Sequence, residues 1–441
     1  METKIAIIGG GLAGLHTAYE LEQRGFKNIV IYEALKIGEG ASGHNTGKVT
    51  IQQAGKYHCL NIEDAKTFYE AQVRALDKLT KIIQEHDISC GFQECLSALT
   101  SHSYSGLTQE CTCYEDLGQS YTMDQSQDIT LQIPSQYSYQ PKKFLYGLSK
   151  ILRYTQIIEN CRILKITKNS DHYLLHSTHN EFTASHIIIC TNYPIFPKTF
   201  SVYLHQIGQY MITTKQPHTS DRYTLSNDQP NLSYNASSIE TRYTGFGARV
   251  GVYNDLKKLS QAFSDTFHTP IGTITYIQDT LTSDGLPIAS PAHLYQNIYV
   301  VTGFNKWGNL NALVCAEVIG NLLTGQKDSV NKLLSYTRAS LYNGTFWSEN
   351  VRTISSLLQR TPSTCIYIDD VPYGEYTKNH TTYLVSLVCP HLKGILRFNP
   401  VSEQYECPVH GSVFNYDGKV LHSPAVQALS TPSQGSEFSS Y

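Results

Sequence analysis

A glycine-rich turn between an apolar strand and a helix constrains this fold more than any other feature of the sequence. Residues 4–8 are strand-like and residues 12–24 have helical periodicity, with Gly9-Gly10-Gly11-Leu12-Ala13-Gly14 where they meet. This spacing matches G-x-G-x-x-G, in which glycine backbone approaches a pyrophosphate at a helix N-terminus. Glu33 ends the next predicted strand, about 20 residues on, where a carboxylate accepts ribose hydroxyls. The pattern predicts an α/β dinucleotide-binding domain and leaves NAD and FAD both open.

Composition excludes several classes of protein. The chain has 441 residues, enough for several folded units, and 34 Lys plus Arg against 37 Asp plus Glu give a net charge of −3. No broad basic field therefore favours nucleic acid, and no apolar run reaches the roughly 20 residues of a membrane span. Without a signal-peptide pattern at the N-terminus, we expect a cytoplasmic protein. Its 11 cysteines are then expected to be free thiols or ligands.

Hydrophobic periodicity predicts the main elements. Helices are expected at about residues 61–86, 142–152, 310–323, 330–341 and 346–359, and residues 160–260 are expected to be mostly strand. A break at Thr361-Pro362-Ser363 predicts a boundary between domains spanning residues 1–360 and 366–430. Residues 431–441 are poor in apolar side chains, so a disordered tail is expected there.

Three further segments carry a family resemblance together with the fingerprint. They are the loop Ala41-Ser42-Gly43-His44-Asn45-Thr46-Gly47, the strand end Ile189-Cys190-Thr191-Asn192, and a late segment with Asp284-Gly285-Leu286-Pro287 and Val300 to Gly308. Over about residues 1–325 the chain resembles the D-amino-acid oxidase-like FAD-dependent oxidoreductases, the glycine and sarcosine oxidase kin. The resemblance implies a Rossmann-type α/β FAD domain interleaved with an α+β mixed-sheet substrate domain.

The same resemblance implies which residues line noncovalently bound FAD. They are Gly9, Gly11, Gly14, Glu33, Ser42, Asn45, Gly47, Thr191, Gly303 and Gly308. The chain departs from its relatives at His44, where Arg is usual, and at Asn309, where Met is common. Arg242 and Arg249 are candidates for holding a substrate carboxylate, with an ordinary surface role as the alternative.

A pair of cysteine–histidine motifs follows the predicted boundary. Cys389-Pro390-His391 and Cys407-Pro408-Val409-His410 offer two thiols and two imidazoles, which suit a tetrahedral zinc or a Rieske [2Fe–2S] cluster. The single residue between Cys389 and His391 is tight for two ligands of one metal but suits neighbouring irons. Residues 366–430 closely resemble the small all-β Rieske domain. This implies that both histidines bind one iron and both cysteines the other.

Many Rieske domains join their two loops by a disulfide, and this chain has Gly394 and Val409 at those positions. Ser412 would donate a hydrogen bond to a bridging sulfide of the cluster. Because these positions hold no cysteine, the two loops are expected to have no covalent link between them, which suits a reducing compartment.

Together the resemblances predict a flavin and iron–sulfur oxidoreductase. It would oxidise an amine or amino acid at FAD and pass single electrons through the cluster to an unidentified acceptor. Two alternatives stay open: a reductase in which electrons flow from cluster to flavin, and a redox sensor or electron-transfer module without its own turnover. The expected partners are a small-molecule substrate and an electron acceptor or donor, with no nucleic acid. No catalytic acid or base can be assigned.

Overall fold

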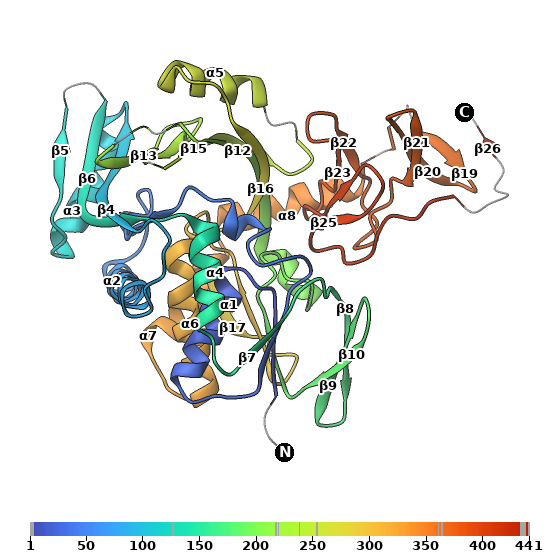
Figure 1. The fold of residues 1–441 in the computed structure, drawn as a ribbon, viewed down its shortest axis with the longest axis horizontal. Coiled ribbons are helices and arrows are strands. Elements are labelled where there is room, and N and C mark those ends of the chain that lie inside the picture. Colours follow the sequence, from blue (N-terminus) through green and yellow to red (C-terminus); the bar gives the residue numbers. More distant parts are fainter. Residues whose placement is uncertain are drawn as a thin grey trace.

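The structure is a computed structural model. It describes residues 4–125, 128–216, 218, 220–237, 239–252, 255–359, 361–362, 365–432 and 438–439. Figure 1 shows helices gathered at the blue N-terminal strands, a long curved sheet above them, and a smaller red β region at the far end.

The N-terminal region is built on a mainly parallel sheet. In the order of the sheet its strands are β17 (Ile288–Pro291), β18 (Ile298–Thr302), β11 (His186–Ile189), β1 (Ile5–Ile8), β2 (Ile29–Tyr32) and β7 (Thr155–Ile158). Neighbouring strands are parallel except β17, which is antiparallel to β18. All four residues of β1 are buried, as expected for a strand covered on both faces.

Different layers cover the two faces of this sheet. Ile5 and Ile7 share a buried cluster with helices α1 (Leu12–Gln23), α2 (Ile62–Glu85) and α6 (Gly308–Thr324). Ala6 and Ile8 point the other way, into a cluster with the small sheet of β8 (Ile163–Asn169), β9 (His172–Ser177) and β10 (Glu181–Ala184). The fingerprint turn is therefore held at the end of a fully sandwiched strand.

A larger mixed sheet forms the second region. Its order is β16 (Thr273–Thr282), β12 (Leu204–Thr214), β15 (Thr241–Arg249), β14 (Ser233–Ala236), β13 (Arg222–Ser226), β4 (Gln93–Ser101), β6 (Ile129–Ser138) and β3 (Lys48–Val49), and β5 (Thr122–Asp124) pairs with β6. The chain passes back and forth between the two sheets, so the two regions are interleaved. The predicted fold class is confirmed.

Most predicted helices are present. Asn61 caps α2 by accepting a hydrogen bond from the backbone N–H of Asp64. Helices α4 (Pro141–Ile151), α6 and α8 (Gly344–Leu357) also match their predictions. The helix expected at residues 330–341 is wrong, because α7 (Ser329–Leu333) is short and only a 3₁₀ turn (Ala339–Leu341) follows.

Two helices were not predicted from the sequence. They are α3 (Tyr104–Asp116) and α5 (Leu256–Phe267). Helix α5 lies at the end of the region expected to be strand. Its apolar face packs Leu259 and Phe263 on Tyr210, Ile212 and Tyr243 of the mixed sheet, so tertiary packing decides its structure there.

The C-terminal region consists of two small antiparallel sheets, in line with the predicted all-β domain. One contains β19 (Ile366–Ile368), β20 (Val371–Lys378) and β21 (Thr381–Ser386), and the other β22 (Arg397–Asn399), β23 (Gln404–Glu406), β24 (Val413–Asn415) and β25 (Val420–His422). Of the expected disordered tail, residues 433–437, 440 and 441 lie outside the described residues, and β26 (Phe438–Ser439) pairs with β19. The boundary near residue 360 stays a prediction.

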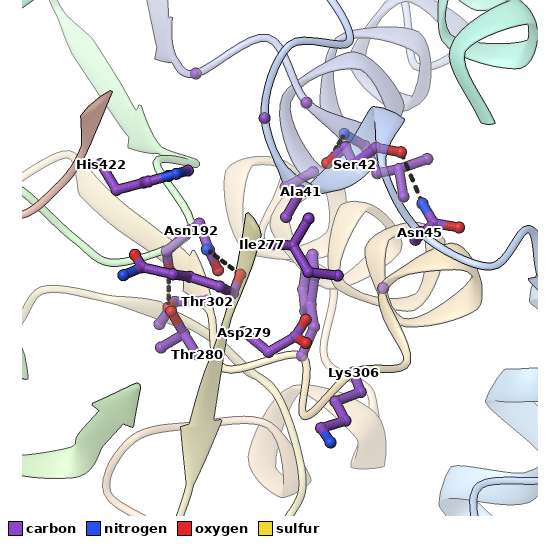
Figure 2. A pocket seen from close by; sticks show the side chains of 18 of the residues that line it. Ala41, Ser42, Asn45, Asn192, Ile277, Asp279, Thr280, Thr302, Lys306 and His422 are labelled. Carbon is purple, nitrogen blue, oxygen red and sulfur yellow. Dashed lines mark hydrogen bonds between the residues drawn. The ribbon is translucent and has the colours of Figure 1, made fainter. Parts of the chain in front are cut away.

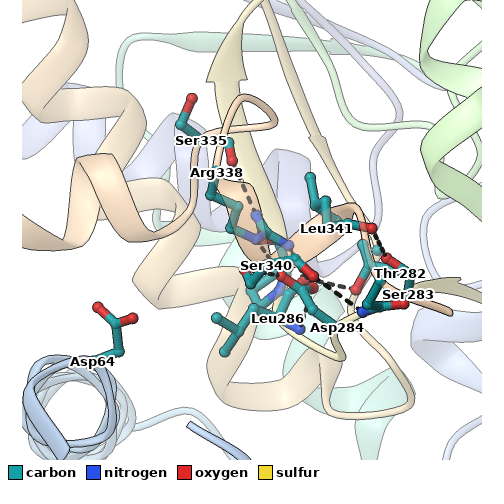
Figure 3. Close-up of polar contacts among 12 residues, drawn as sticks. Asp64, Thr282, Ser283, Asp284, Leu286, Ser335, Arg338, Ser340 and Leu341 are labelled. Carbon is teal, nitrogen blue, oxygen red and sulfur yellow. Dashed lines mark hydrogen bonds and ion pairs between the residues drawn. The ribbon is translucent and has the colours of Figure 1, made fainter. Parts of the chain in front are cut away.

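A buried ion pair fixes the segment that returns to the parallel sheet (Figure 3). Arg338 donates from Nε to Asp284 Oδ2 at 2.6 Å and from Nη2 to Asp284 Oδ1 at 2.8 Å, and both side chains are 6% exposed. Ser340 adds a hydrogen bond to the same carboxylate at 2.6 Å. Arg338 also donates to the backbone carbonyls of Leu286 and Pro287. The Asp284–Pro287 turn is thereby held to the segment that follows α7.

No helix in the described ranges is long and apolar enough to cross a membrane.

Candidate functional site

A cavity of about 630 Å³ is lined from both large sheets (Figure 2). Of the residues predicted to hold FAD, those that line it are Gly9, Gly11, Glu33, Ser42, Asn45, Thr191, Gly303 and Gly308. Gly14 and Gly47 do not line it. The sequence prediction therefore names residues that the fold brings together, although they come from segments up to 300 residues apart.

The fingerprint glycines are required by close backbone packing. A Cβ on Gly14 would lie 1.9 Å from the carbonyl oxygen of Gly9, and one on Gly9, at φ +108°, would lie 2.4 Å from that of Cys190. Gly11 leaves room for Ser42, whose Oγ accepts a hydrogen bond from the backbone N–H of Leu12 at 3.1 Å. This open backbone at the N-terminus of α1 fits a pyrophosphate.

Glu33 braces the same turn. Its carboxylate accepts hydrogen bonds from the backbone N–H groups of Gly10 at 2.7 Å and Leu35 at 2.9 Å. A carboxylate has about four acceptor sites, so lone pairs remain for ribose hydroxyls. The bracing role is an addition that the sequence pattern does not reveal.

The loop after β2 is tied together by Asn45. Its side-chain amide donates to Ser42 O at 2.7 Å, and its carbonyl oxygen accepts from the backbone N–H of Gly47 at 2.8 Å. Gly47 has φ +71°, and a Cβ there would lie 2.1 Å from Tyr139 O. Gly47 therefore permits the backbone conformation and close packing of the loop without lining the cavity, whereas Ser42 and Asn45 line it. His44 hydrogen-bonds Gly40 O at 3.0 Å and does not line the cavity.

The late segment supplies the other side of the cavity. Gly303 has φ +70°, and Gly308 begins α6, so the N-terminal end of a 17-residue helix faces the cavity. The partial positive charge of such a helix end favours an electron-rich group. Asn309, the departure from its relatives, lines the cavity, donates to Lys48 O at 2.6 Å and accepts from Tyr139 Oη at 2.8 Å.

Lys48 is a cavity residue that sequence reasoning did not single out. Its Nζ donates to Thr224 O at 2.5 Å and to Ser233 Oγ at 2.6 Å. The Tyr223 ring lies 5.4 Å from Nζ. Burial lowers the pKa of this ammonium to about 7. A buried amine that titrates near neutrality can accept or donate a proton at the cavity wall.

Asp279 and Lys306 are a second polar pair on the cavity wall (Figure 2). Burial raises the pKa of Asp279, and the neighbouring charge of Lys306 partly offsets that rise. Gln209 donates to Asp279 Oδ2 at 3.0 Å. Lys306 remains open to the cavity. Asp279 escaped the sequence analysis because its strand carries no motif.

The two arginines considered for a substrate carboxylate do not line this cavity. Arg242 donates to Glu240 Oε1 at 2.8 Å and to Asn45 O at 2.6 Å. Arg249 donates to Glu349 Oε2 at 2.7 Å, which joins β15 to α8. The structure therefore favours a packing role for both.

The predicted cluster ligands meet at the tips of two similar loops. In each loop the cysteine closes the turn, with Cys389 N donating to Gly394 O at 2.9 Å and Cys407 N to Ser412 O at 2.8 Å. The His391 and His410 rings are 5.1 Å apart. Cys389 and Cys407 belong to one buried cluster, and each thiol shifts the pKa of the other, lowering that of Cys389 and raising that of Cys407. The thiols thus pair with each other, and the imidazoles with each other, as a Rieske cluster requires.

The imidazoles are in the state that binds metal. Burial lowers the pKa of His391 to about 4 and that of His410 to about 3, so both rings are neutral. His410 Nδ1 is buried and has no hydrogen-bond partner within the described part of the chain. Such an orphaned nitrogen fits a ligand atom.

Two thiols and two imidazoles also suit a tetrahedral zinc, which the sequence left open. A [2Fe–2S] cluster needs only two protein ligands on each iron. The donor set therefore fits the cluster.

An apolar contact holds the two loops where a disulfide is common. A Cβ on Gly394 would lie 2.4 Å from Val409 Cγ2. Ser412 Oγ accepts from the backbone N–H of Ala425 at 3.0 Å and contacts the Cys389 thiol. The cluster loops are thus packed without a covalent link.

Comparisons with known proteins follow the same division. The chain matches the FAD dependent oxidoreductase (DAO) family over residues 4–322 and the Rieske [2Fe-2S] domain over residues 355–433. A Rieske 2Fe-2S iron-sulfur protein of Bacillus subtilis, YhfW, is 25% identical over 97% of this chain and 93% of its own length.

Two solved structures share the fold of the larger part. Glycine oxidase from Geobacillus kaustophilus has a TM-score of 0.65 at 14% identity, covering 76% of this chain and 98% of its own. L-proline dehydrogenase from P. horikoshii has a TM-score of 0.63 at 15% identity, covering 75% and 95%.

Proposed function

Since this chain belongs to the FAD dependent oxidoreductase family and carries a Rieske [2Fe-2S] domain, we propose that it oxidises an amine or amino acid at FAD and passes the electrons singly through the cluster to an external acceptor. FAD, when bound, takes two electrons from a C–H bond beside nitrogen and can return them one at a time. The chain's own residues bind, orient and tune both cofactors.

The observation that carries this proposal is that the C-terminal region forms part of the wall of the cavity proposed for the flavin. Leu421, His422, Ser423 and Val426 of the C-terminal region line the same cavity as the fingerprint glycines, and Figure 2 shows His422 there. Ser423 Oγ also donates to the carbonyls of Thr191 and Tyr193, at 3.1 Å each. A C-terminal region that helps to build the flavin cavity supports direct electron exchange between the two cofactors.

The charges in the cavity support a substrate with nitrogen and carboxylate groups. Lys306 offers a cation and Asp279 an anion, which complement the two ends of a zwitterion. Lys48 can take the proton that leaves the substrate nitrogen, because its amine titrates near neutrality. The chain supplies these groups from strands β16 and β3 and from the turn before α6.

A cytoplasmic location belongs to the same proposal. None of the 11 cysteines forms a disulfide, and nine of them lie outside the proposed cluster ligands Cys389 and Cys407. Free thiols at this number are typical of a reducing compartment.

Anaerobic mixing of the purified holoprotein with a panel of amines and amino acids tests the function. We expect a subset to bleach the flavin and then to produce the paramagnetic signal of the reduced cluster. Lys306→Met should raise KM for amino acids more than for simple amines, because only the former carry a carboxylate. If no compound bleaches the flavin, whereas a reduced electron carrier reduces it through the cluster, the protein is a reductase and the proposal is wrong.

A further inference from the structure

Two buried glutamines connect the flavin cavity to the cluster loop. Gln206 on β12 and Gln278 on β16 both line the cavity, and they are 4% and 1% exposed. Gln278 Nε2 donates to Gly411 O at 3.1 Å. Gly411 is next to the cluster ligand His410. The side-chain amide of Gln278 therefore lies between the cavity and the cluster loop.

Gln206 strengthens this connection. With the oxygen and nitrogen of its amide assigned so that both find partners, the nitrogen lies within hydrogen-bonding distance of three acceptors for its two N–H groups: Gly411 O at 3.1 Å, His410 O at 3.2 Å and Gln278 Oε1 at 3.2 Å. A Cβ on Gly411 would lie 1.9 Å from the Gln206 amide. The loop therefore approaches the amides as closely as a glycine backbone permits.

Other contacts hold the loop in place around the glutamines. Gly251 N donates to Glu406 Oε2 at 2.8 Å, and Asn399 Nδ2 donates to Tyr210 Oη at 3.2 Å. The His410 ring is 6.0 Å from the Tyr193 ring. His410 is buried on this side, whereas His391 is only half-buried. The cluster loop is thus fixed against the wall of the cavity.

We infer that Gln206 and Gln278 are positioning residues that hold the His410 side of the cluster against the flavin cavity and couple the two redox sites. His410 is then the cluster ligand nearer the flavin cavity, and His391 is the ligand farther from it. The inference rests on the proposed transfer between flavin and cluster and adds the residues that carry it. The contacts of this route are present in the structure as it stands.

The electrons balance along this route. Oxidation of one amine to an imine releases two electrons and two protons. Bound FAD would take both electrons from the amine, and a bound [2Fe–2S] cluster would pass them one at a time to a one-electron acceptor outside the protein. The protons leave to solvent.

Flash photoreduction of the holoprotein with deazaflavin tests the inference without any substrate. In the wild type we expect a first-order phase, independent of protein concentration, in which the flavin is reoxidised as the cluster is reduced. In Gln206→Leu/Gln278→Leu this phase should slow by about tenfold, because the unpaired loop carbonyls must shift or admit water. The paramagnetic signal of the dithionite-reduced cluster should also shift.

Gln72→Leu is the matched control, because Gln72 is buried on α2 and contacts Asn311 away from the loop. It should leave the rate and the signal unchanged. If the double variant does not retain its cofactors, Gln278→Asn keeps the amide and shortens its reach, and the same slowing is expected. Wild-type rates and signals in these variants would overturn the inference alone. Absence of the phase in the wild type would overturn the proposed transfer itself.

Discussion

At the scale of single residues, one buried imidazole stands out. His16 on α1 is 1% exposed, and neither ring nitrogen has a hydrogen-bond partner among the described residues. Burial, assisted by the charge of Lys78, lowers its pKa to about 3. The unfolded chain therefore binds more protons than the folded one between about pH 3 and 6.5, so the free energy of unfolding rises with pH across that window.

We expect His16→Leu to stabilise the protein, and to do so most at acidic pH. The wild type should lose up to about 1.4 kcal/mol per pH unit from this residue as the pH falls below about 6.5, and the variant should not. Urea unfolding at several pH values measures the difference. Parallel pH profiles for wild type and variant would refute the assignment.

Glu33 gives a second test at this scale. Glu33→Gln removes one acceptor from the Gly10 and Leu35 N–H groups, so we expect weaker FAD retention and a loss of roughly 1–2 kcal/mol in stability. Dialysis followed by flavin absorbance measures the retention. Glu39→Gln is the control, since Glu39 is exposed beside Lys142. If both variants retain FAD equally well, Glu33 does not contribute to FAD binding.

At the scale of elements, the buried pair of Asp284 and Arg338 is the sharpest test. Asp284→Asn leaves the guanidinium buried without its counter-charge, so we expect a loss of roughly 3–5 kcal/mol in stability. The exposed pair of Arg74 and Glu317 is the control, and Arg74→Met should cost less than about 1 kcal/mol. Chemical denaturation measures both. Similar losses would mean that burial does not strengthen this contact.

Sequence patterns predicted those elements whose signal is local. The fingerprint, the Asn61 cap and the two Cys–His loops are read from neighbouring residues, and the fold class follows from them. Gln206, Gln278 and Asp279 are different, because they become cavity residues only through the pairing of β12 with β16. Nothing in residues 200–280 marks that register. Helix α5 was missed for the same reason, since its packing on the mixed sheet decides its structure.

At the scale of the whole molecule, the C-terminal region lines the cavity that we propose for the flavin. A chain that ends at Thr361 loses the wall formed by Leu421, His422, Ser423 and Val426. We therefore expect it to bind FAD more weakly than the full chain does. The FAD dissociation rate of each protein, measured by flavin fluorescence, gives the comparison.

His410→Ala in the full chain distinguishes the contribution of the C-terminal wall to FAD retention from that of the cluster. This variant should lose the cluster but keep the wall, and so retain FAD like the wild type. If the shortened chain retains FAD equally well, the C-terminal wall is not part of the flavin site. If His410→Ala releases FAD as fast as the shortened chain, the cluster itself holds the wall in place.

The shared wall also has a consequence for biosynthesis. A ribosome makes the fingerprint turn first and the wall residues 421–426 some 400 residues later. Until those residues emerge, the nascent chain has the phosphate-binding turn but an incomplete cavity. The proposed flavin cavity is therefore completed only near the end of translation, so a chain interrupted between residues 410 and 421 has all four predicted cluster ligands but lacks part of the cavity wall.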